Sequence, residues 1–241
     1  ELFKDADKAI ASGKNLIIIL ISLAFVSCND SLVTEREKEA VQSVLDFYGG
    51  VCHRSKGINS ENGNNSTYFQ LKMTNSEIIE SDLEHLDLTS SHIAYLFYNN
   101  LKDEKSNYDE VQVVIVLNDN SEYEYNFPVT TLERVNQRMT VMNKTVTLLK
   151  NQDYESLKSM LNIDLIPVDK EQLIPRLKEV EPQLGKVQEF QFFGFMIVPY
   201  KELEVLHLSG ALIREKQNHE FSIDVDYNSD KVELYQIRFA S

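Results

Sequence analysis

The sequence predicts an α+β fold built from two units, and three features of the chain lead to this prediction. Residues 35–127 combine two helical patterns with short strands. A long amphipathic helical pattern of about 20 residues follows Pro128. From Lys186 onward the pattern changes to four strands, and the third of them alternates as expected for an antiparallel sheet with one buried face. We therefore expect an N-terminal α+β unit at 35–128 and a C-terminal unit at 129–241, in which helices pack on a sheet.

The first helix is predicted at residues 35–48. Thr34 and Glu37 form a T-x-x-E capping box at its start, and Gly49-Gly50 ends it. Its apolar side chains recur at helical spacing and form one face: Val41, Val44, Leu45 and Tyr48.

Strands are predicted on both sides of a polar stretch that follows this helix. Residues 51–54 and 68–73 are predicted strands. The segment 57–67 between them is rich in Asn, Ser and Gly and is predicted to be a loop.

A second helix and a strand pair complete the first unit. Ser91 is expected to cap this helix, because apolar residues follow it at helical spacing from Ile93 to Leu101. The β-branched run 111–117 and the alternating run 123–127 are predicted strands, joined by the turn residues Asn118-Asp119-Asn120-Ser121.

The second unit is expected to open with a long helix. Thr130 and Glu133 form another T-x-x-E box. Apolar residues then recur at spacings of three and four: Leu132, Val135, Met139, Met142, Val146 and Leu149. The methionines suit either an adaptable binding face or ordinary core packing.

Two shorter helices and four strands follow. Asp153 is expected to cap a helix that carries Tyr154, Leu157 and Leu161. A further helix carries Leu173, Leu177 and Val180, with Pro175 near its first turn and Gly185 past its end. The strands are predicted at 187–198, 203–214, 219–227 and 232–239.

The third of these strands alternates strictly between apolar and polar side chains. His219, Phe221, Ile223, Val225 and Tyr227 share one face, and Glu220, Ser222, Asp224 and Asp226 share the other. We expect the first face to be buried and the second to be in contact with water.

An uncharged and mostly apolar run precedes both units. From residue 16 to Ser27 it has 12 residues, fewer than the ~20 needed to span a bilayer but within the range of a signal-peptide apolar region. Lys14 supplies a positive flank, and Cys28 follows Ser27 directly.

The segment from Lys14 through Cys28 to Asp30 resembles a bacterial lipoprotein signal peptide with its lipobox. The resemblance implies a signal peptide at 1–27, cleavage before Cys28, and acylation of Cys28 by palmitate-type chains. Residues 28–34 would then be a tether to the membrane, on the periplasmic or surface side of the cell envelope. The alternative is a buried helix with Cys28 as an ordinary core residue.

The order of one long helix, short helices and long antiparallel strands resembles the nuclear transport factor 2-like fold. The residues that carry the resemblance are 151–157, 184–186 and 231–239, and it covers roughly 130–241. It implies a curved sheet that wraps a helix to form a cone, often with a pocket. Enzymes of this fold place an Asp, His or Tyr in the pocket, so the candidates here are His207, His219, Tyr200 and Tyr227; the alternative for each is a packed or rim side chain.

Composition and motifs exclude several function classes. The 38 acidic and 24 basic residues give a net charge of −14, which opposes binding to nucleic-acid phosphates. Two cysteines cannot form a disulfide scaffold or a four-cysteine zinc site. If Cys28 carries lipid, Cys52 has no partner in the chain, and a packed thiol is a simpler interpretation than a Cys52–His53 nucleophile.

No motif for nucleotide, zinc-protease or serine-hydrolase chemistry occurs in the sequence. Residues 224–230 copy the first half of a calcium loop, but Ser229 and Tyr235 stand where Gly and Glu are needed, so a hairpin turn around 228–230 is expected. We predict no metal and no cofactor.

These features together predict a non-catalytic, lipid-anchored cell-envelope protein that binds a small molecule, peptide or protein partner. The alternative is a cone-fold enzyme of the isomerase or dehydratase type. A role in periplasmic assembly or inhibition also remains open.

Overall fold

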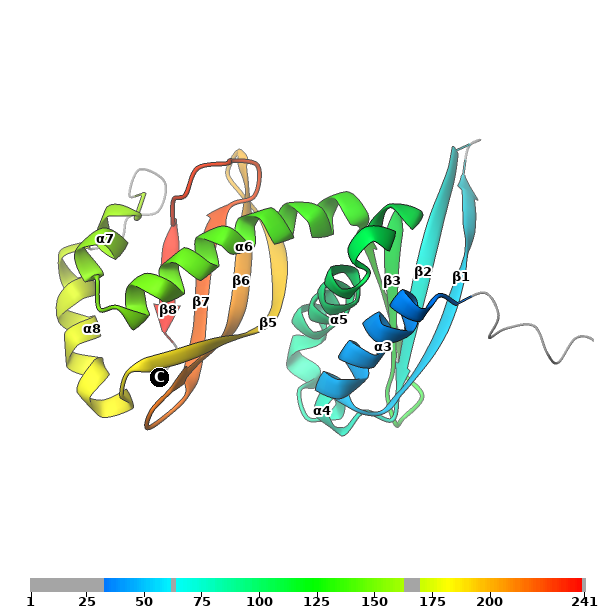
Figure 1. Cartoon of the computed structure of the whole chain (residues 1–241), viewed down its shortest axis with the longest axis horizontal. Coiled ribbons are helices and arrows are strands. Elements are labelled where there is room, and N and C mark those ends of the chain that lie inside the picture. The colour runs from blue at the N-terminus through cyan, green and yellow to red at the C-terminus, as the bar shows by residue number, and fades with distance from the viewer. Residues whose placement is uncertain (1–32, 62–63, 163–169, 240–241) are drawn as a thin grey trace, which may run out of the picture.

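In its described residues the chain has an α+β fold with two four-stranded sheets (Figure 1). The computed structural model describes residues 33–61, 64–162 and 170–239. The apolar run at 16–25 and the predicted lipidation site Cys28 lie outside the described residues. Within the described part of the chain, no helix has the length and apolar character needed to cross a membrane.

The first unit packs helices on one face of a mixed sheet. Its elements are α3 (Glu35–Tyr48), β1 (Val51–Glu61), β2 (Asn64–Thr74), α4 (Glu77–Glu80), η1 (Leu83–His85), α5 (Leu86–Asn100), η2 (Lys102–Asn107), β3 (Glu110–Val116) and β4 (Glu122–Pro128). The sheet order is β1-β2-β3-β4, and only β2 and β3 are parallel. A parallel pair needs a long crossover, which α4 and α5 supply.

The predicted start of α3 is confirmed in detail. Thr34 Oγ1 accepts a hydrogen bond from the Glu37 backbone N–H at 3.1 Å, and the Glu37 carboxylate accepts from the Thr34 N–H at 2.9 Å. The Glu37 side chain is fully buried and also accepts from Lys56 Nζ at 2.9 Å and from the Tyr108 hydroxyl. The capping carboxylate therefore ties α3 to β1 and to the start of β3.

Two predictions for the first unit are wrong. The expected loop at 57–67 belongs to a long hairpin, in which β1 and β2 pair from Val51↔Thr74 to Glu61↔Asn64. The small polar residues of 57–67 are typical of a loop. An edge strand buries few side chains, however, so backbone hydrogen bonds between β1 and β2 are enough to keep this segment regular. Ser91 does not cap α5, because this helix begins at Leu86 and is buried on nearly all sides.

In the second unit, the described residues form three helices that pack with an antiparallel sheet. Its elements are α6 (Val129–Lys150), α7 (Tyr154–Ser159), α8 (Lys170–Leu184), β5 (Val187–Tyr200), β6 (Leu203–Arg214), β7 (His219–Asp226) and β8 (Gln236–Phe239). The sheet order is β5-β6-β7-β8. In Figure 1, α6 crosses in front of this sheet and reaches the first unit.

The start of α6 differs from the prediction. The helix begins at Val129, directly after Pro128, and no side chain caps it. Thr130 therefore lies inside the first turn, so the predicted box with Glu133 is wrong. In contrast, Asp153 caps α7 as predicted, since its Oδ1 accepts from the Ser156 N–H at 3.1 Å. Pro175 lies inside α8, beyond its first turn.

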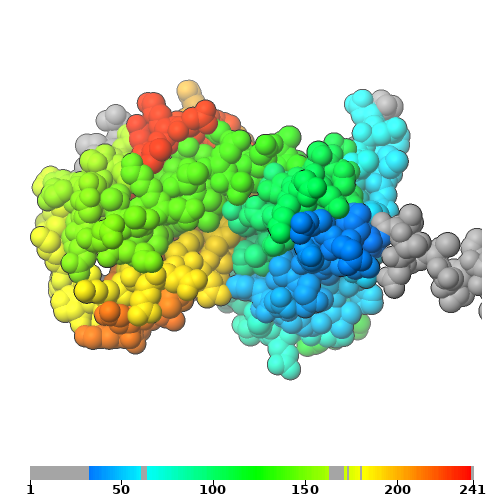
Figure 2. Space-filling view, in the orientation of Figure 1, coloured from blue at the N-terminus to red at the C-terminus, as the bar shows by residue number. Residues whose placement is uncertain are grey.

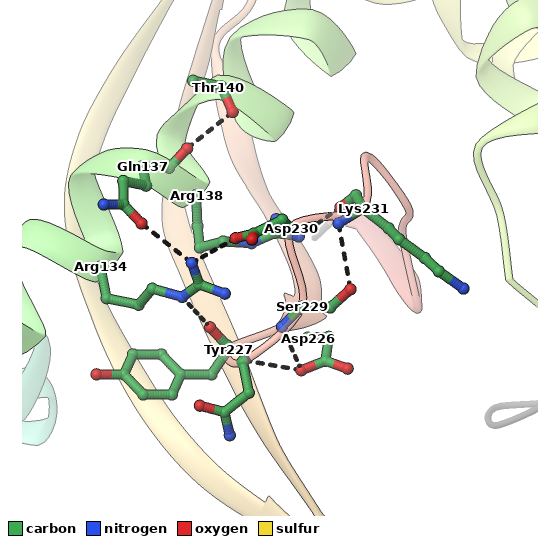
Figure 3. A network of polar contacts seen from close by, with 10 residues as sticks. Arg134, Gln137, Arg138, Thr140, Asp226, Tyr227, Ser229, Asp230 and Lys231 are labelled. Atoms are coloured by element: carbon green, nitrogen blue, oxygen red, sulfur yellow. Dashed lines mark hydrogen bonds and ion pairs between the residues drawn. The ribbon is translucent and has the colours of Figure 1, made fainter.

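The last strand is shorter than predicted because the preceding chain is held against α6 as a loop (Figure 3). Arg134 donates from Nε to the Tyr227 carbonyl at 2.6 Å and pairs with Asp230 at 2.6 Å. Arg138, which is 3% exposed, donates to the Lys231 carbonyl at 2.8 Å. These bonds hold residues 227–231 against α6, and Leu234 then forms an isolated bridge with Leu161 before β8 begins.

Helix α5 joins the two units through the edge strand β5. The Ser91 hydroxyl donates to the Leu88 carbonyl and accepts from the Phe195 N–H, both at 2.8 Å. Next to this bond Gly194 adopts φ +139°, and a Cβ there would lie 2.1 Å from the Leu88 oxygen. Buried side chains of both units form one hydrophobic cluster, and in the view of Figure 2 the two units make one continuous surface.

Candidate functional site

The inner face of the second sheet is buried as predicted for β7, but its outer face differs from the prediction. On the inner face, Leu206, Leu208 and Ile223 are fully buried in the core that α6 covers. On the outer face, Ser222 and Asp224 were expected to meet water, but they are only 9% and 4% exposed. The expectation is wrong because β7 is a central strand that pairs with β6 and β8, and His207 and Arg238 from these two strands hydrogen bond to Asp224.

A hollow of about 370 Å³ lies on this outer face. We call it the outer-face site; its lining residues are Met196, Val198, Tyr200, Val205, His207, Asp224, Gln236 and Arg238. All four strands contribute, since the ladder pairs Met196 with His207, His207 with Asp224, and Asp224 with Gln236. The site thus has an apolar side from β5 and β6 and a polar side from β6, β7 and β8.

Asp224 organises the polar side of the site. Arg238 donates two hydrogen bonds to its carboxylate, from Nη2 at 2.6 Å and from Nη1 at 3.1 Å. This bidentate geometry fixes the guanidinium plane. Arg238 also donates to Gln236 Oε1 at 2.6 Å, and its side chain stays 46% exposed. The buried carboxylate therefore has a charge partner that remains open to a ligand.

His207 is the third member of this cluster. Its Nδ1 lies 2.7 Å from Asp224 Oδ1. An ionised carboxylate only accepts hydrogen bonds, so Nδ1 carries the proton and donates it. In the neutral ring Nε2 then holds the lone pair. Arg238 Nη1 lies 3.2 Å from Nδ1, and since both atoms carry protons, their contact is one of packing.

The structure separates the four residues predicted to line a pocket. Tyr200 and His207 both line the outer-face site. His219 starts β7 and stacks on Phe239, with ring centroids 5.7 Å apart. Burial lowers the pKa of His219 to about 4, so its ring is neutral near pH 7. Tyr227 follows the other end of β7 and packs on the core.

Sequence reasoning missed Asp224, Gln236 and Arg238 as members of one site. Alternation along β7 correctly placed Asp224 on the outer face. The register that sets it beside His207 and Arg238 depends on pairing with β6 and β8. The signal that could have found the Asp224–Arg238 pair is the presence of opposite charges at matching positions of adjacent strands.

A second hollow, of about 270 Å³, lies between the two units. The ends of α3 and α5 and the segment around α4 and η1 form one wall, and the outer face of the second sheet forms the other. Ser209 lines this cleft and stands two residues after His207 in β6, so the two hollows occupy the same sheet face. His85 lines it too, and its hydrogen bond to Asp82, at 2.6 Å, raises the pKa of the imidazole.

The remaining sequence candidates have structural roles. Cys52 is free and half-buried, and burial raises the pKa of its thiol to about 12. This favours the packed-thiol interpretation over a nucleophile. Asp226 accepts from the N–H groups of Asn228 and Ser229 and so forms the expected turn. Among the described residues, no cluster of three His, Cys, Asp or Glu side chains could hold a metal ion.

Comparison with known proteins adds no relative: no protein-family model matches the chain, and neither the curated proteins nor the solved structures give a significant match.

Proposed function

We propose that this chain is a non-catalytic binding module of the bacterial cell envelope, held at a membrane by lipid on Cys28, and that its ligand binds at the outer-face site. The observation that carries the binding proposal is the Asp224–Arg238–His207 cluster beside an open apolar wall. A buried carboxylate that orients an exposed guanidinium and an imidazole presents fixed polar groups toward solvent.

The lining of the site indicates the chemistry of its ligand. Val198 is 44% exposed beside Met196 and Val205, so an aliphatic group gains by covering this surface. Arg238 offers donors, and the free Nε2 of His207 offers an acceptor. A small molecule or side chain with an aliphatic body and a hydroxyl or carboxyl end fits this combination.

Two further parts of the proposal rest on resemblance. A nuclear transport factor 2-like cone is supported by α6, which lies across the inner face of an antiparallel sheet. The lipid anchor is supported by the apolar run that ends at Ser27-Cys28. With a net charge of −14 the chain gains nothing from anionic lipid surfaces, so attachment would depend on acyl chains.

Binding is tested by NMR with ¹⁵N-labelled protein and a library of small aliphatic acids and alcohols. We expect chemical-shift changes to cluster at the outer-face site. Val198→Asp should weaken the best fragment at least ~10-fold, equal to about 1.4 kcal/mol. The matched control is Val232→Asp, because Val232 is 43% exposed outside the site. Shifts that cluster elsewhere, or equal weakening by both variants, would contradict binding at this site.

The anchor is tested separately by expressing the chain in a bacterium with and without globomycin. We expect a mass increase at Cys28 and recovery in the membrane fraction, both lost on globomycin treatment and in Cys28→Ser. An unprocessed chain with an unmodified Cys28 thiol would refute the anchor.

A second candidate function is a cone-fold enzyme in which His207 acts as general base. The specific observation in its favour is that buried Asp224 orients His207 Nδ1 and leaves Nε2 free to take a proton. This chemistry would be seen as deuterium transfer from D₂O to acidic carbon atoms of carbonyl probe compounds. Loss of such exchange in His207→Gln would support the enzyme, and no exchange with the unaltered chain would count against it.

A further inference from the structure

The cleft between the two units is a second candidate binding site, and we call it the inter-unit cleft. Its volume of about 270 Å³ suits a ligand smaller than a typical drug molecule. The end of α3, residues between 78 and 89, and the outer face of the second sheet line it. Both units therefore supply walls, and α5 joins them through the hydrogen bond between Ser91 and Phe195.

One part of the cleft lining is aromatic and aliphatic. Phe47 and Tyr48 come from the end of α3, and Phe193 comes from β5. Phe47 and Phe193 are half-buried, and Ile78 is 49% exposed. Water thus contacts part of this apolar surface, and the apolar body of a ligand gains free energy by covering it. Aromatic rings also attract a cation that lies over the ring within about 6 Å.

The charged part of the lining is mainly acidic. Asp82 and Glu220 come from opposite walls, and His85 is the one basic residue in the described lining. Asp82 is already paired with His85, at 2.6 Å. In contrast, Glu220 forms no hydrogen bond or ion pair within the described part of the chain. The charge argument for a ligand therefore depends on Glu220.

The charge of Glu220 acts across the cleft. The pKa of His85 is raised first by its hydrogen bond to Asp82, and the carboxylate of Glu220 on the opposite wall adds to this effect. Two carboxylates against one imidazole leave the cleft negatively charged whether or not His85 carries a proton. Complementary charge thus favours a cation over a neutral molecule or an anion.

From this combination we propose that the inter-unit cleft binds a small organic amine in its protonated form. The ammonium group pairs with the Glu220 carboxylate, and an aromatic or aliphatic body lies against Phe193 of the second unit and Ile78 of the first. This ligand has the opposite charge to the acids that fit the outer-face site. The proposal therefore stands or fails independently of binding at that site.

The test uses NMR titrations of the ¹⁵N-labelled full chain with three probes of similar shape. These are 2-phenylethylamine, which is positively charged near neutral pH, the neutral 2-phenylethanol and the anionic 3-phenylpropanoate. We expect the amine to give saturable shift changes at Ser209, Gly210 and Glu220. The alcohol and the acid should bind at this cleft at least ~5-fold more weakly.

Four variants locate the amine. Glu220→Gln removes the unpaired carboxylate and should weaken binding at least ~5-fold. Phe193→Leu and Ile78→Ser reduce the apolar contact from the two walls and should each weaken binding about threefold. Glu124→Gln makes the same charge change as Glu220→Gln on exposed β4, outside the cleft, and should leave binding unchanged. Circular dichroism checks that each variant is folded.

Other outcomes would overturn the proposal. Equal affinity for the amine and the alcohol would exclude a charged contact, and equal weakening by Glu124→Gln would reduce the effect to net charge. No saturable shift changes in the cleft at millimolar amine would exclude an amine site there, and changes confined to His207 and Arg238 would place the amine at the outer-face site. A capped tripeptide with lysine between two phenylalanines that binds the cleft more tightly than the amine would replace the small molecule by a lysine side chain.

Discussion

Replacing Gly194 by alanine should strongly destabilise the junction between the two units. Gly194 lies at the irregularity in β5, where the register with β6 shifts between Phe192 and Gly194. A Cβ built there lies 2.1 Å from the Leu88 carbonyl oxygen and 2.7 Å from Ser91 Oγ. Because the first of these atoms is backbone, α5 and β5 must move apart to make room.

The magnitude follows from two costs. Overpacking of a tight contact typically costs about 1–3 kcal/mol. A φ of +139° disfavours any residue with a Cβ by about 1–3 kcal/mol more. The shift would also stretch the hydrogen bond from the Phe195 N–H to Ser91 Oγ. We expect Gly194→Ala to lower the free energy of unfolding by about 2–6 kcal/mol in total.

Urea denaturation followed by far-UV circular dichroism measures this loss, since the chain has no tryptophan. Gly57→Ala is the matched control. Its Cβ would lie 2.8 Å from the hydroxyl oxygen of Tyr68, the far end of a side chain that can move. We expect a change below about 1 kcal/mol there. Equal effects of the two substitutions would refute the close approach of α5 to β5.

Three further predictions concern buried polar groups. Glu37→Gln removes the buried carboxylate that accepts from Lys56 and from the start of α3. The free energy of unfolding, measured by urea denaturation, should fall by about 2 kcal/mol. A fall below about 0.5 kcal/mol would contradict this. Burial lowers the pKa of His92 from 6.5 to about 3, so below pH 6.5 the unfolded chain binds a proton that the folded chain does not. The free energy of unfolding should therefore fall as the pH is lowered from 6.5 toward 3, by up to ~1.4 kcal/mol per pH unit. His92→Gln should flatten this dependence on pH, and an unchanged dependence in the variant would contradict the burial of His92. Asp224→Asn breaks the bidentate pair with Arg238. Because the Arg238 side chain is 46% exposed and regains water, the free energy of unfolding should fall by only about 1–2 kcal/mol in the same urea assay. An unchanged urea midpoint would argue against the pair.

Elements with a strong apolar period were predictable from sequence. The capping box at Thr34 and Glu37 fixed the start of α3, and the apolar repeat from Leu132 to Leu149 indicated α6. A β-branched run indicated β3, alternation indicated β4 and β7, and the change of pattern after Lys186 indicated β5 and β6. Most of the apolar side chains that set these patterns fill the core or pack against it, so local pattern and final packing agree; Tyr123 of β4, at 41% exposed, is an exception.

Elements held by long-range contacts were not predictable in this way. The distal part of the β1–β2 hairpin carries polar residues that resemble a loop, and only pairing between the strands makes it regular. Ser91 resembles a helix cap, yet it bonds Phe195 more than 100 residues later in the chain. The cluster around Asp224 depends on the register of three strands. Such features require the tertiary arrangement, since no single segment contains them.

The position of a bound fragment is the most direct test of binding at the outer-face site. A structure of the chain with the tightest aliphatic acid or alcohol from the NMR screen would give this position. We predict a ligand on the outer face of the second sheet, with its polar end at Arg238 or His207 and its aliphatic part on Val198. A ligand lodged between α6 and the inner face of the sheet, with Arg238 and His207 untouched, would contradict the proposed site.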